Sequence, residues 1–507
     1  MVRWFVDRLP QRGIPSVSLR RLLPGAHFGG LPDWEVSGCT ADSRRLEPGQ
    51  VFVAVRGPRH DGHAFVRQAL ERGAAGVVVE RPCPEAGRLQ VVVADTRAAY
   101  ARLCHALAGD PAEGLPIVGV AGTHGRTAAA LFLRSIFEAS GARFGLVGAL
   151  GWSDGVATRP VGASSAGPEA LAAMLAAMVE RGCAGGVVEV TDDALDGRGM
   201  EGIRYESVLV TDLGGSHDSD REALWARRRS AARLLRKVVP GGATIVNADD
   251  PDVEPLGAVN LDARRVSFGL ERPADVTARI VRLDASGSRF VLRGFDREAA
   301  VELRLAGRRN VSHAAAAAAA AWSRGLALEA VVAGLEGIST VPGRLEAIGI
   351  EEGQDFGVWI DQARRGVELE HALASLRTTG AGRIHLVLGA EGDGDRATRQ
   401  ALARAAESGA ESVILTTDNP RTEGPDAIVD DLLSGFRRPG RVRVEADRRH
   451  AIEIALSAAS PGDAVLIAGK GRHSFQILAD RALPVNDKTV VTRWLRDRYR
   501  AERRAMA

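Results

Sequence analysis

Lysine is nearly missing from this 507-residue chain. Of its 66 basic residues only Lys237, Lys470 and Lys488 are lysines, so arginine carries almost all of the positive charge. The arginine bias of a GC-rich genome explains most of this pattern. It matters for chemistry, because the planar, forked guanidinium group is a poor substitute where a site needs a compact ammonium group.

Cysteine and long apolar stretches are also scarce. The four cysteines are scattered without CxxC spacing, which argues against a zinc site or a disulfide scaffold and is typical of a reducing compartment. The N-terminal residues lack the apolar core of a secretory signal. The longest apolar run, residues 314–321, is too short to span a bilayer. We therefore expect a cytoplasmic protein without membrane insertion.

A strong net charge is absent as well. Lys and Arg number 66 and Asp and Glu number 64, so no overall field exists that would attract nucleic acid, and we expect no nucleic-acid partner. Hydrophobic residues make up 45% of the chain and charged residues 26%, as in ordinary globular proteins. The length predicts about three domains.

The order of strand and helix signals predicts an α/β protein with three domains. Residues 1–113 alternate short β-rich runs with helical patterns, which indicates a small N-terminal α/β domain. Residues 114–340 contain continuous apolar runs typical of parallel strands buried on both faces, then an antiparallel-like stretch at 274–305 and an alanine-rich helix at 311–324. Residues 341–507 alternate again, which predicts a Rossmann-like C-terminal domain.

The clearest local motif is Gly119-Val-Ala-Gly-Thr-His-Gly-Arg-Thr127, which follows an apolar strand and opens a helix. This is the setting of a phosphate-binding loop (P-loop), because glycines let backbone N–H groups face phosphate oxygens and the helix N-terminus adds positive potential. Thr127 could hold Mg²⁺ through its hydroxyl. Arg126 stands where such loops have lysine. A glycine-rich turn without any ligand is the alternative interpretation.

The whole set of motifs resembles the Mur ligases, and within them the UDP-N-acetylmuramoyl-tripeptide synthetases. The resemblance extends over essentially the whole chain, with the motifs in the expected order. They are Thr40–Arg44, residues 48–54 and Asp61–His63; the P-loop, Glu189, residues 247–251, residues 307–311 and residues 341–344; and residues 416–421 and 469–471.

The resemblance implies a reaction and a set of ligands. ATP phosphorylates the carboxylate of UDP-MurNAc-L-Ala-D-Glu, and the amine of a third amino acid attacks the acyl phosphate. ATP and Mg²⁺ are thereby implied as cofactors, a UDP-MurNAc-peptide as the small-molecule partner, and other cell-wall synthetases as possible protein partners. An Asp-Asn-Pro-Arg motif in this family goes with meso-diaminopimelate, whose distal carboxylate the arginine can grip.

The resemblance also implies roles for particular residues. Nucleotide binding falls to Gly122, Thr123, His124, Gly125, Arg126, Thr127, Asn310, Arg344 and Asp361, and UDP-sugar binding to Ser43 and Arg44. Acceptor binding falls to Asp418, Asn419, Arg421, Gly469 and His473. The catalytic set is Arg126, Glu189 and Asp193, and the metal ligands are Thr127 and Glu189.

Several positions depart from the family pattern. Ala231 replaces the lysine whose carbamoylated side chain bridges metal ions, and alanine offers no ligand. Asp193 stands in place of a metal-ligating histidine, while Arg364 replaces the histidine of an Asp-Tyr-Ala-His motif. His473 occupies the place of the glutamate that meets the acceptor's ammonium group. Residues 166–167 and the loop 212–218 also match the family pattern poorly.

Three hypotheses follow. The first is a degenerate Mur ligase homologue that keeps the fold and some nucleotide binding but ligates weakly or not at all, because each lost transition-state contact costs ~10²–10³ in rate. The second is an active, divergent ATP-dependent amide ligase in which arginines take over the cationic roles. The third is a protein that uses the three-domain fold only to interact with other proteins and binds no small-molecule ligand. A Rossmann dehydrogenase is disfavoured because no GxGxxG-plus-acid unit is present.

Overall fold

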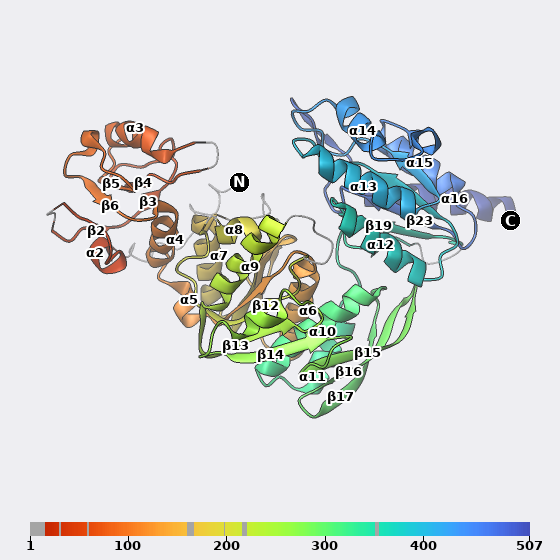
Figure 1. Ribbon diagram of the computed structural model, residues 1–507, viewed down its shortest axis with the longest axis horizontal. Coiled ribbons are helices and arrows are strands. Elements are labelled where there is room, and N and C mark those ends of the chain that lie inside the picture. Colours follow the sequence, from red (N-terminus) through yellow and green to blue (C-terminus); the bar gives the residue numbers. More distant parts are fainter. Residues whose placement is uncertain are drawn as a thin grey trace. The chain divides into compact units, whose positions relative to one another are not determined.

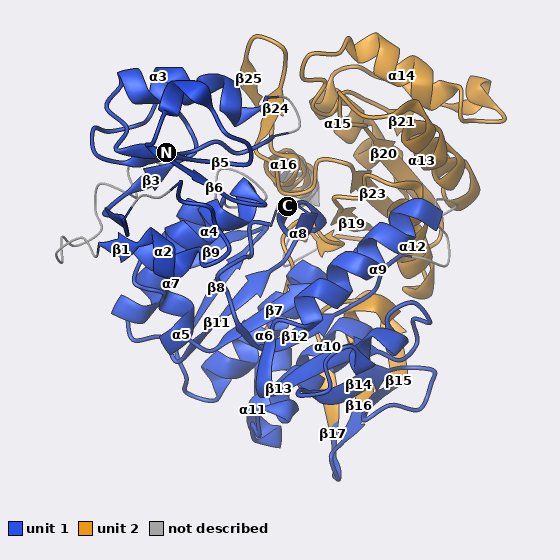
Figure 2. Cartoon of the chain, turned by 60° about the vertical axis from the view of Figure 1, so that its left-hand side comes forward, with its two compact units in different colours: residues 1–278, 292–299, 312–335 blue, residues 279–291, 300–311, 336–507 orange. Residues whose placement is uncertain are grey.

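The computed structural model describes residues 16–29, 32–57, 60–159, 167–196, 198–214, 221–349 and 354–506. Residue 166 and most of the loop 212–218, both named above, lie outside these ranges. The chain divides into two compact units (Figure 2). Unit 1 comprises residues 1–278, 292–299 and 312–335, and unit 2 comprises residues 279–291, 300–311 and 336–507. Among the described residues, every helix is too short or too polar for a membrane span.

Unit 1 begins with a small parallel sheet (Figure 1). Its strands are β3 (Cys39–Thr40), β4 (Val51–Val53), β5 (Gly76–Val79) and β6 (Gln90–Val92), paired in that order. Successive side chains of a strand point to opposite faces, so Val51 and Val53 join one buried cluster and Phe52 joins another. Helix α4 (Thr96–Leu107) begins at an N-cap, Asp95, whose carboxylate accepts two backbone N–H groups.

The remaining elements of this region are short. They are β1 (Val17–Ser18), α2 (Leu19–Leu22), β2 (Glu35–Val36), the 3₁₀ turns η1 (Gly62–Phe65) and η2 (Pro84–Ala86), and α3 (Val66–Glu71). The alternation of strands and helices that the sequence indicated for this region is present.

Helix α4 carries a fully buried histidine, His105, for whose ring nitrogens the described structure records no hydrogen-bond partner. Burial lowers the pKa of His105 to about 4, and the nearby Lys237 acts in the same direction. The imidazole is therefore neutral in the folded protein at pH 7.

This histidine predicts a pH dependence of stability. Its folded pKa of about 4 lies below the unfolded value of 6.5, so between these values the unfolded chain binds more protons. We expect the free energy of unfolding to fall by up to about 3 kcal/mol as the pH drops from 6.5 to 4. Urea unfolding at several pH values checks this: His105→Gln should remove that part of the dependence, whereas His60→Gln, at an exposed position, should retain it.

The larger sheet of unit 1 places β7 (Ile117–Ala121) between two parallel neighbours, β11 (Gly185–Glu189) and β12 (Tyr205–Val210). The sheet order is β10-β9-β8-β11-β7-β12-β13-β14, with β15, β16 and β17 following. The other strands are β8 (Phe144–Gly148), β9 (Gly151–Ser153), β10 (Thr158–Arg159), β13 (Val238–Asn247) and β14 (Arg264–Gly269). The parallel core confirms the expectation drawn from the continuous apolar runs.

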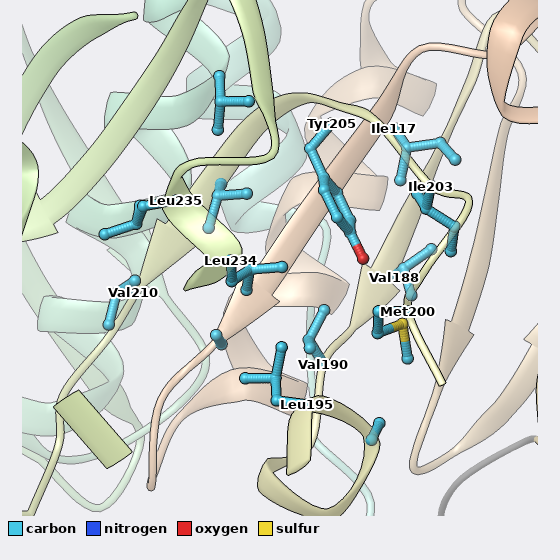
Figure 3. Close-up of a cluster of buried hydrophobic side chains, with 14 of the residues drawn as sticks. Ile117, Val188, Val190, Leu195, Met200, Ile203, Tyr205, Val210, Leu234 and Leu235 are labelled. Atoms are coloured by element: carbon cyan, nitrogen blue, oxygen red, sulfur yellow. The ribbon is translucent and has the colours of Figure 1, made fainter. Parts of the chain in front are cut away.

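Helices pack against this sheet through a continuous apolar cluster. Figure 3 shows part of it, with Ile117, Val188 and Tyr205 from the strands beside Leu234 and Leu235 from α9. The helices of this cluster are α5 (Pro111–Gly114), α7 (Pro168–Glu180), α8 (Asp192–Asp196) and α9 (Arg221–Leu235), with the 3₁₀ turn η3 (Glu254–Ala258). Helix α6 (Arg126–Ala139) lies against β8 and β11 and contributes no residue to this cluster.

The antiparallel-like stretch and the alanine run also form the expected elements. Strands β15 (Val276–Asp284), β16 (Gly287–Gly294) and β17 (Arg297–Leu303) are neighbours joined by two-residue turns. Phe295 and Asp296, in one of these turns, both have positive φ, as a type I′ hairpin requires. Helices α10 (Arg308–Ser323) and α11 (Leu328–Glu336) follow, and residues 314–321 of α10 are fully buried.

Unit 2 is a doubly wound sheet with strand order β18-β19-β23-β20-β21-β22. The strands are β18 (Glu346–Ala347), β19 (Gly357–Ile360), β20 (Ile384–Leu388), β21 (Ser412–Leu415), β22 (Arg443–Val444) and β23 (Ala464–Ala468). Leu386 and Leu388 join one core cluster and Val387 joins the other, so both faces are buried, as expected.

The helices of unit 2 cover these two faces. They are α12 (Gly366–Thr378), α13 (Arg396–Gly409), α14 (Pro425–Leu433), α15 (Arg448–Ala458) and α16 (Asp487–Met506), with the turn η4 (Pro439–Arg441) and the hairpin β24 (Phe475–Ile477) and β25 (Ala482–Pro484). Ligands bind such sheets beyond the carboxyl ends of the strands, which directs attention to the loops after β19, β20, β21 and β23.

Candidate functional site

The P-loop in unit 1 has a backbone that only glycine permits. Gly122 has φ of 132°, and Gly125 has φ of 79° as the N-cap of α6. A Cβ at Gly125 would lie 2.0 Å from His313 Nε2, and one at Gly122 would lie 2.1 Å from Thr211 Oγ1. Within the part of the chain that the structure describes, no side chain caps the start of α6, so the N–H groups of its first turn can bind an anion.

Neighbouring strand ends hold this loop in place. Thr123 N donates to the backbone oxygen of Asp212 at 2.9 Å, and His124 N donates to the Asp212 carboxylate at 3.0 Å. Thr211, the residue before, donates its hydroxyl to Ala121 O at 3.2 Å. The loop is therefore preorganised, and its geometry fits a phosphate group.

The cation expected at the end of the loop is turned inward. The Arg126 guanidinium donates through Nη1 to the carbonyl oxygen of Gly122, within the loop itself. No described lysine replaces it, because each one is bonded elsewhere in its own unit. Lys237 pairs with Glu201 at 2.7 Å, Lys488 pairs with Glu346 at 2.7 Å, and Lys470 donates to backbone carbonyls.

Thr127 and Glu189 meet beside the loop. The Thr127 hydroxyl donates to Glu189 Oε2 at 3.0 Å, while Ala149 N donates to Glu189 Oε1 at 3.1 Å. A Cβ at Gly148 would lie 2.1 Å from Glu189 Oε1, so this carboxylate needs a glycine beside it. One hydroxyl and one carboxylate suit a single Mg²⁺ that also takes phosphate oxygens and waters. Within the described residues, no group of three or more His, Cys, Asp or Glu side chains could hold a metal ion.

The position of the expected metal-bridging lysine is apolar. Ala231 lies on α9, is 3% exposed and belongs to the same apolar cluster as Leu234 and Leu235. The adjacent Ser230 donates its hydroxyl to Asp196 at 2.7 Å. Asp193 is exposed in the first turn of α8. The donor set therefore does not fit a second, lysine-anchored metal ion.

The residues predicted to bind the uridine nucleotide lie in the first sheet's loops. Ser43 is buried and donates its hydroxyl to Gln68 Oε1 at 2.7 Å. Arg44 is exposed and pairs with Asp42 at 2.9 Å, which lowers the pKa of that carboxyl. Such an exposed pair is weak, so Arg44 remains available to a phosphate group.

Three predicted nucleotide ligands belong to unit 2. Asn310 donates its side-chain amide to Ala306 O at 2.8 Å. Asp361 accepts Leu345 N at 2.7 Å, and burial raises the pKa of Asp361 to about 6, although Arg344 opposes the shift. Arg344 itself is exposed. The structure thus brings Arg344 and Asp361 together within unit 2, while the P-loop residues belong to unit 1.

The predicted acceptor residues converge at the strand ends of unit 2. Asp418 is 1% exposed, and neither of its carboxylate oxygens has a hydrogen-bond partner among the described residues. Burial raises the pKa of Asp418, while Arg448 and Arg364 oppose the shift. Gly469 has φ of 102°, and a Cβ there would lie 2.8 Å from Asp418 Oδ2. Asn419 accepts Ile477 N at 2.9 Å.

The imidazole of His473 completes this group. Its Nε2 lies 3.3 Å from Gln362 Nε2. Burial lowers the pKa of His473 to about 4, and the positive charges of Arg364 and Arg472 act in the same direction. The ring is therefore neutral at pH 7, which supports the expectation that it cannot counter an ammonium group.

Sequence reasoning assigned no role to two residues of this region. Lys470 is fully buried and donates to the carbonyl oxygens of His473, Phe475 and Val485 at 2.6–2.7 Å, so it shapes the loop after β23. Burial lowers its pKa to about 8. Glu391 pairs with both Arg364 and Arg421. Its position 30 residues from Arg421 carried no local signal.

Comparisons with known proteins agree with this architecture. Residues 35–108 match the model described as Mur ligase family, catalytic domain, residues 120–321 the Mur ligase middle domain, and residues 343–471 the Mur ligase glutamate ligase domain. The UDP-N-acetylmuramoyl-L-alanyl-D-glutamate–2,6-diaminopimelate ligase of Geobacillus thermodenitrificans is 33% identical over 488 residues, covering 94% of this chain and 98% of that protein.

Solved structures give the same result. A structure of a UDP-N-acetylmuramoyl-L-alanyl-D-glutamate–2,6-diaminopimelate ligase is 25% identical with a TM-score of 0.69, covering 96% of this chain and all of that chain. The MurF ligase of Thermotoga maritima in complex with ADP is 17% identical with a TM-score of 0.58, covering 85% and 94%, and shares the fold. From its sequence, its two units and these matches, the chain belongs to the Mur ligase family.

Proposed function

We propose that this chain is a Mur ligase homologue of the diaminopimelate-adding type that keeps nucleotide binding but forms amide bonds weakly or not at all. One observation carries the proposal: both lysines that the family pattern expects are missing from unit 1. The P-loop lysine position holds Arg126, which is bonded to Gly122 O, and the bridging-lysine position holds Ala231, which is buried in apolar surroundings.

The physical reason is the negative charge of the phosphoryl group that must be transferred. Carboxylate activation transfers a γ-phosphoryl group, and preorganised cations stabilise its transition state. Losing one such contact costs ~10²–10³ in rate, so losing two independent ones costs ~10⁴ or more. In addition, the neutral His473 supplies no negative charge to pair with the acceptor's ammonium group.

Nucleotide binding rests on the parts of the site that remain. The N–H groups at the start of α6 and the hydroxyl of Thr127 would hold the phosphates, and Thr127 with Glu189 would hold one Mg²⁺. A bound Mg²⁺ would neutralise phosphate charge. The ADP complex of the MurF ligase, which shares this fold, supports a nucleotide as the ligand. A UDP-MurNAc-peptide would bind at Ser43 and Arg44.

An active, divergent ligase is the second candidate. The retained Thr127–Glu189 pair and the 33% identity to a named ligase favour it. A third outcome is a protein without any nucleotide affinity. A chain that binds nucleotide without ligation would be suited to regulate or scaffold active cell-wall synthetases.

Phosphate release separates these functions. The chain is incubated with ATP–Mg²⁺, UDP-MurNAc-L-Ala-D-Glu and diaminopimelate, beside the Geobacillus thermodenitrificans relative, while calorimetry measures ATP–Mg²⁺ binding. We expect binding of the nucleotide and a turnover about 10⁴-fold or more below that of the relative. Turnover within about tenfold of the relative would establish the active ligase instead. Absence of nucleotide binding would favour the pure interaction protein.

A further inference from the structure

Three strand ends of unit 2 bring charged side chains together, and a fourth adds a glycine. Arg364 follows β19, Glu391 follows β20, Asp418 and Arg421 follow β21, and Gly469 follows β23. Carboxyl ends of parallel strands lie at one edge of a sheet, so these loops lie beside one another at that edge. The electrostatic influence of Arg364 and Glu391 on both Asp418 and His473 agrees with this placement.

Glu391 is held in the manner of a bound carboxylate. Its Oε2 lies 2.8 Å from Arg364 Nη1, and its Oε1 lies 2.5 Å from Arg421 Nη2. Each carboxylate oxygen therefore faces one guanidinium group, which is the arrangement that two arginines would offer to a ligand's carboxylate. Arg364 also donates through Nε to Gly469 O at 3.4 Å.

The backbone enforces this contact. Gly392 N donates to Asn419 O at 2.8 Å, and a Cβ at Gly392 would lie 1.8 Å from Pro420 O, so the two loops touch directly. Arg421 has φ of 54°, a left-handed backbone conformation that is costly for a residue with a side chain.

A buried arginine ties the same two loops together. Arg399, 3% exposed in its side chain, donates to the backbone oxygen of Glu391 at 3.2 Å and pairs with Glu423 at 2.5 Å. The Thr422 hydroxyl also donates to Asp393 at 2.6 Å. Glu391 is therefore placed by a cross-linked pair of loops, unlike a mobile surface ion pair.

We propose that Glu391 is a specificity-determining residue that occupies the carboxylate position of the acceptor pocket. The assignment of this pocket to an acceptor rests on the proposed function. Because Glu391 satisfies Arg364 and Arg421, the native chain excludes a diamino diacid such as 2,6-diaminopimelate at this position. An entering carboxylate would have to displace Glu391 and would meet two neighbouring acids, Glu391 and Asp418. Asp418, with no recorded hydrogen bond, remains as a partner for an amine.

The test is calorimetric titration of the full chain with meso-2,6-diaminopimelate, without ATP. We expect the wild type to bind weakly or undetectably, and Glu391→Ala to bind at least about tenfold more tightly. Glu391→Ala/Arg421→Ala should lose this gain, because the carboxylate would then lack one of its arginines. Glu370→Gln, which removes an exposed charge from α12 of the same unit, should behave like the wild type.

Three results would overturn the proposal: tight binding by the wild type, no gain in a folded Glu391→Ala, or an undiminished gain in the double variant. Thermal unfolding by circular dichroism establishes whether each variant is folded. If Glu391→Ala is not folded, Glu391→Gln keeps the side-chain shape and takes its place, and the absence of a gain there rejects the proposal equally. Because this readout is binding, it is independent of whether the chain turns over ATP.

Discussion

Replacing Asp487 by alanine is expected to lower the free energy of unfolding of unit 2 by about 3–5 kcal/mol. The Asp487 carboxylate accepts Arg448 Nε at 2.9 Å and Arg448 Nη2 at 2.8 Å, and both side chains are 0% exposed. Truncating one partner leaves a buried guanidinium with only Ala468 O, at 3.2 Å, and the nearby Asp418 to stabilise it. Urea unfolding followed by circular dichroism measures the loss.

Two further variants isolate the cause. Arg448→Met/Asp487→Ala removes both charges and should recover a large part of the loss, because no uncompensated ion remains in the interior. Asp497→Ala, on the same helix α16, breaks an exposed pair with Arg493 and should change stability by less than about 0.5 kcal/mol. A loss below about 1 kcal/mol for Asp487→Ala would contradict the interpretation of a costly buried charge.

Arg126→Lys alone is expected not to restore ligation, and to leave phosphate release at least about 10²-fold below that of the Geobacillus thermodenitrificans relative. The change supplies the compact ammonium group at the P-loop, but Ala231 still provides no anchor for a second metal ion. A remaining deficit of ~10²–10³ is therefore expected for the missing contact alone. The measurement is the phosphate-release assay with ATP–Mg²⁺, UDP-MurNAc-L-Ala-D-Glu and diaminopimelate.

Two further variants test whether Ala231 limits activity. Ala231→Lys places a long cationic side chain in an apolar cluster, so its stability must be measured together with its activity. Arg126→Lys/Ala231→Lys/Glu391→Ala combines the changes at the P-loop, the metal anchor and the acceptor pocket, and should release more phosphate than any single variant. Robust turnover by Arg126→Lys alone would show that Ala231 is not limiting.

The two units are expected to limit ligation for different reasons. In unit 1 the groups needed for ligation are missing, since the described residues contain neither a lysine at the P-loop nor a metal ligand at Ala231. In unit 2 the groups are present but engaged, since Arg421 keeps its place in the Asp-Asn-Pro-Arg motif while Glu391 satisfies its charge. A restored ligase would therefore need additions in unit 1 and a removal in unit 2.

Local patterns predicted most of the fold. The apolar runs before Gly122 and at residues 384–388 became parallel strands, because such runs are stable only when both faces of a sheet are covered. The alanine run became the buried part of α10. The P-loop was equally visible, since Gly119, Gly122 and Gly125 lie close together in the sequence, and the positive φ of Gly122 and Gly125 requires glycine.

The candidate site was visible only in part. Arg126, Glu189 and Asp418 stand out because each lies at the end of a strand or shortly after it, within a short motif. Glu391 did not, because its partners Arg364 and Arg421 lie on other loops, and a lone glutamate in a polar loop has no distinguishing pattern. The same holds for the Arg448–Asp487 pair, whose members are 39 residues apart.

The sequence by itself determined the α/β class, the family and the absence of lysine from the P-loop, since all of these follow from residue type and near-neighbour order. Tertiary structure alone decided which charges are already satisfied. It showed Arg126 bonded to its own loop, Lys470 bonded to three carbonyl oxygens, and Arg421 paired with Glu391. Whether a cation is available to a ligand depends on which acceptors the fold places within about 3 Å of it, and that distance is set by packing between distant segments.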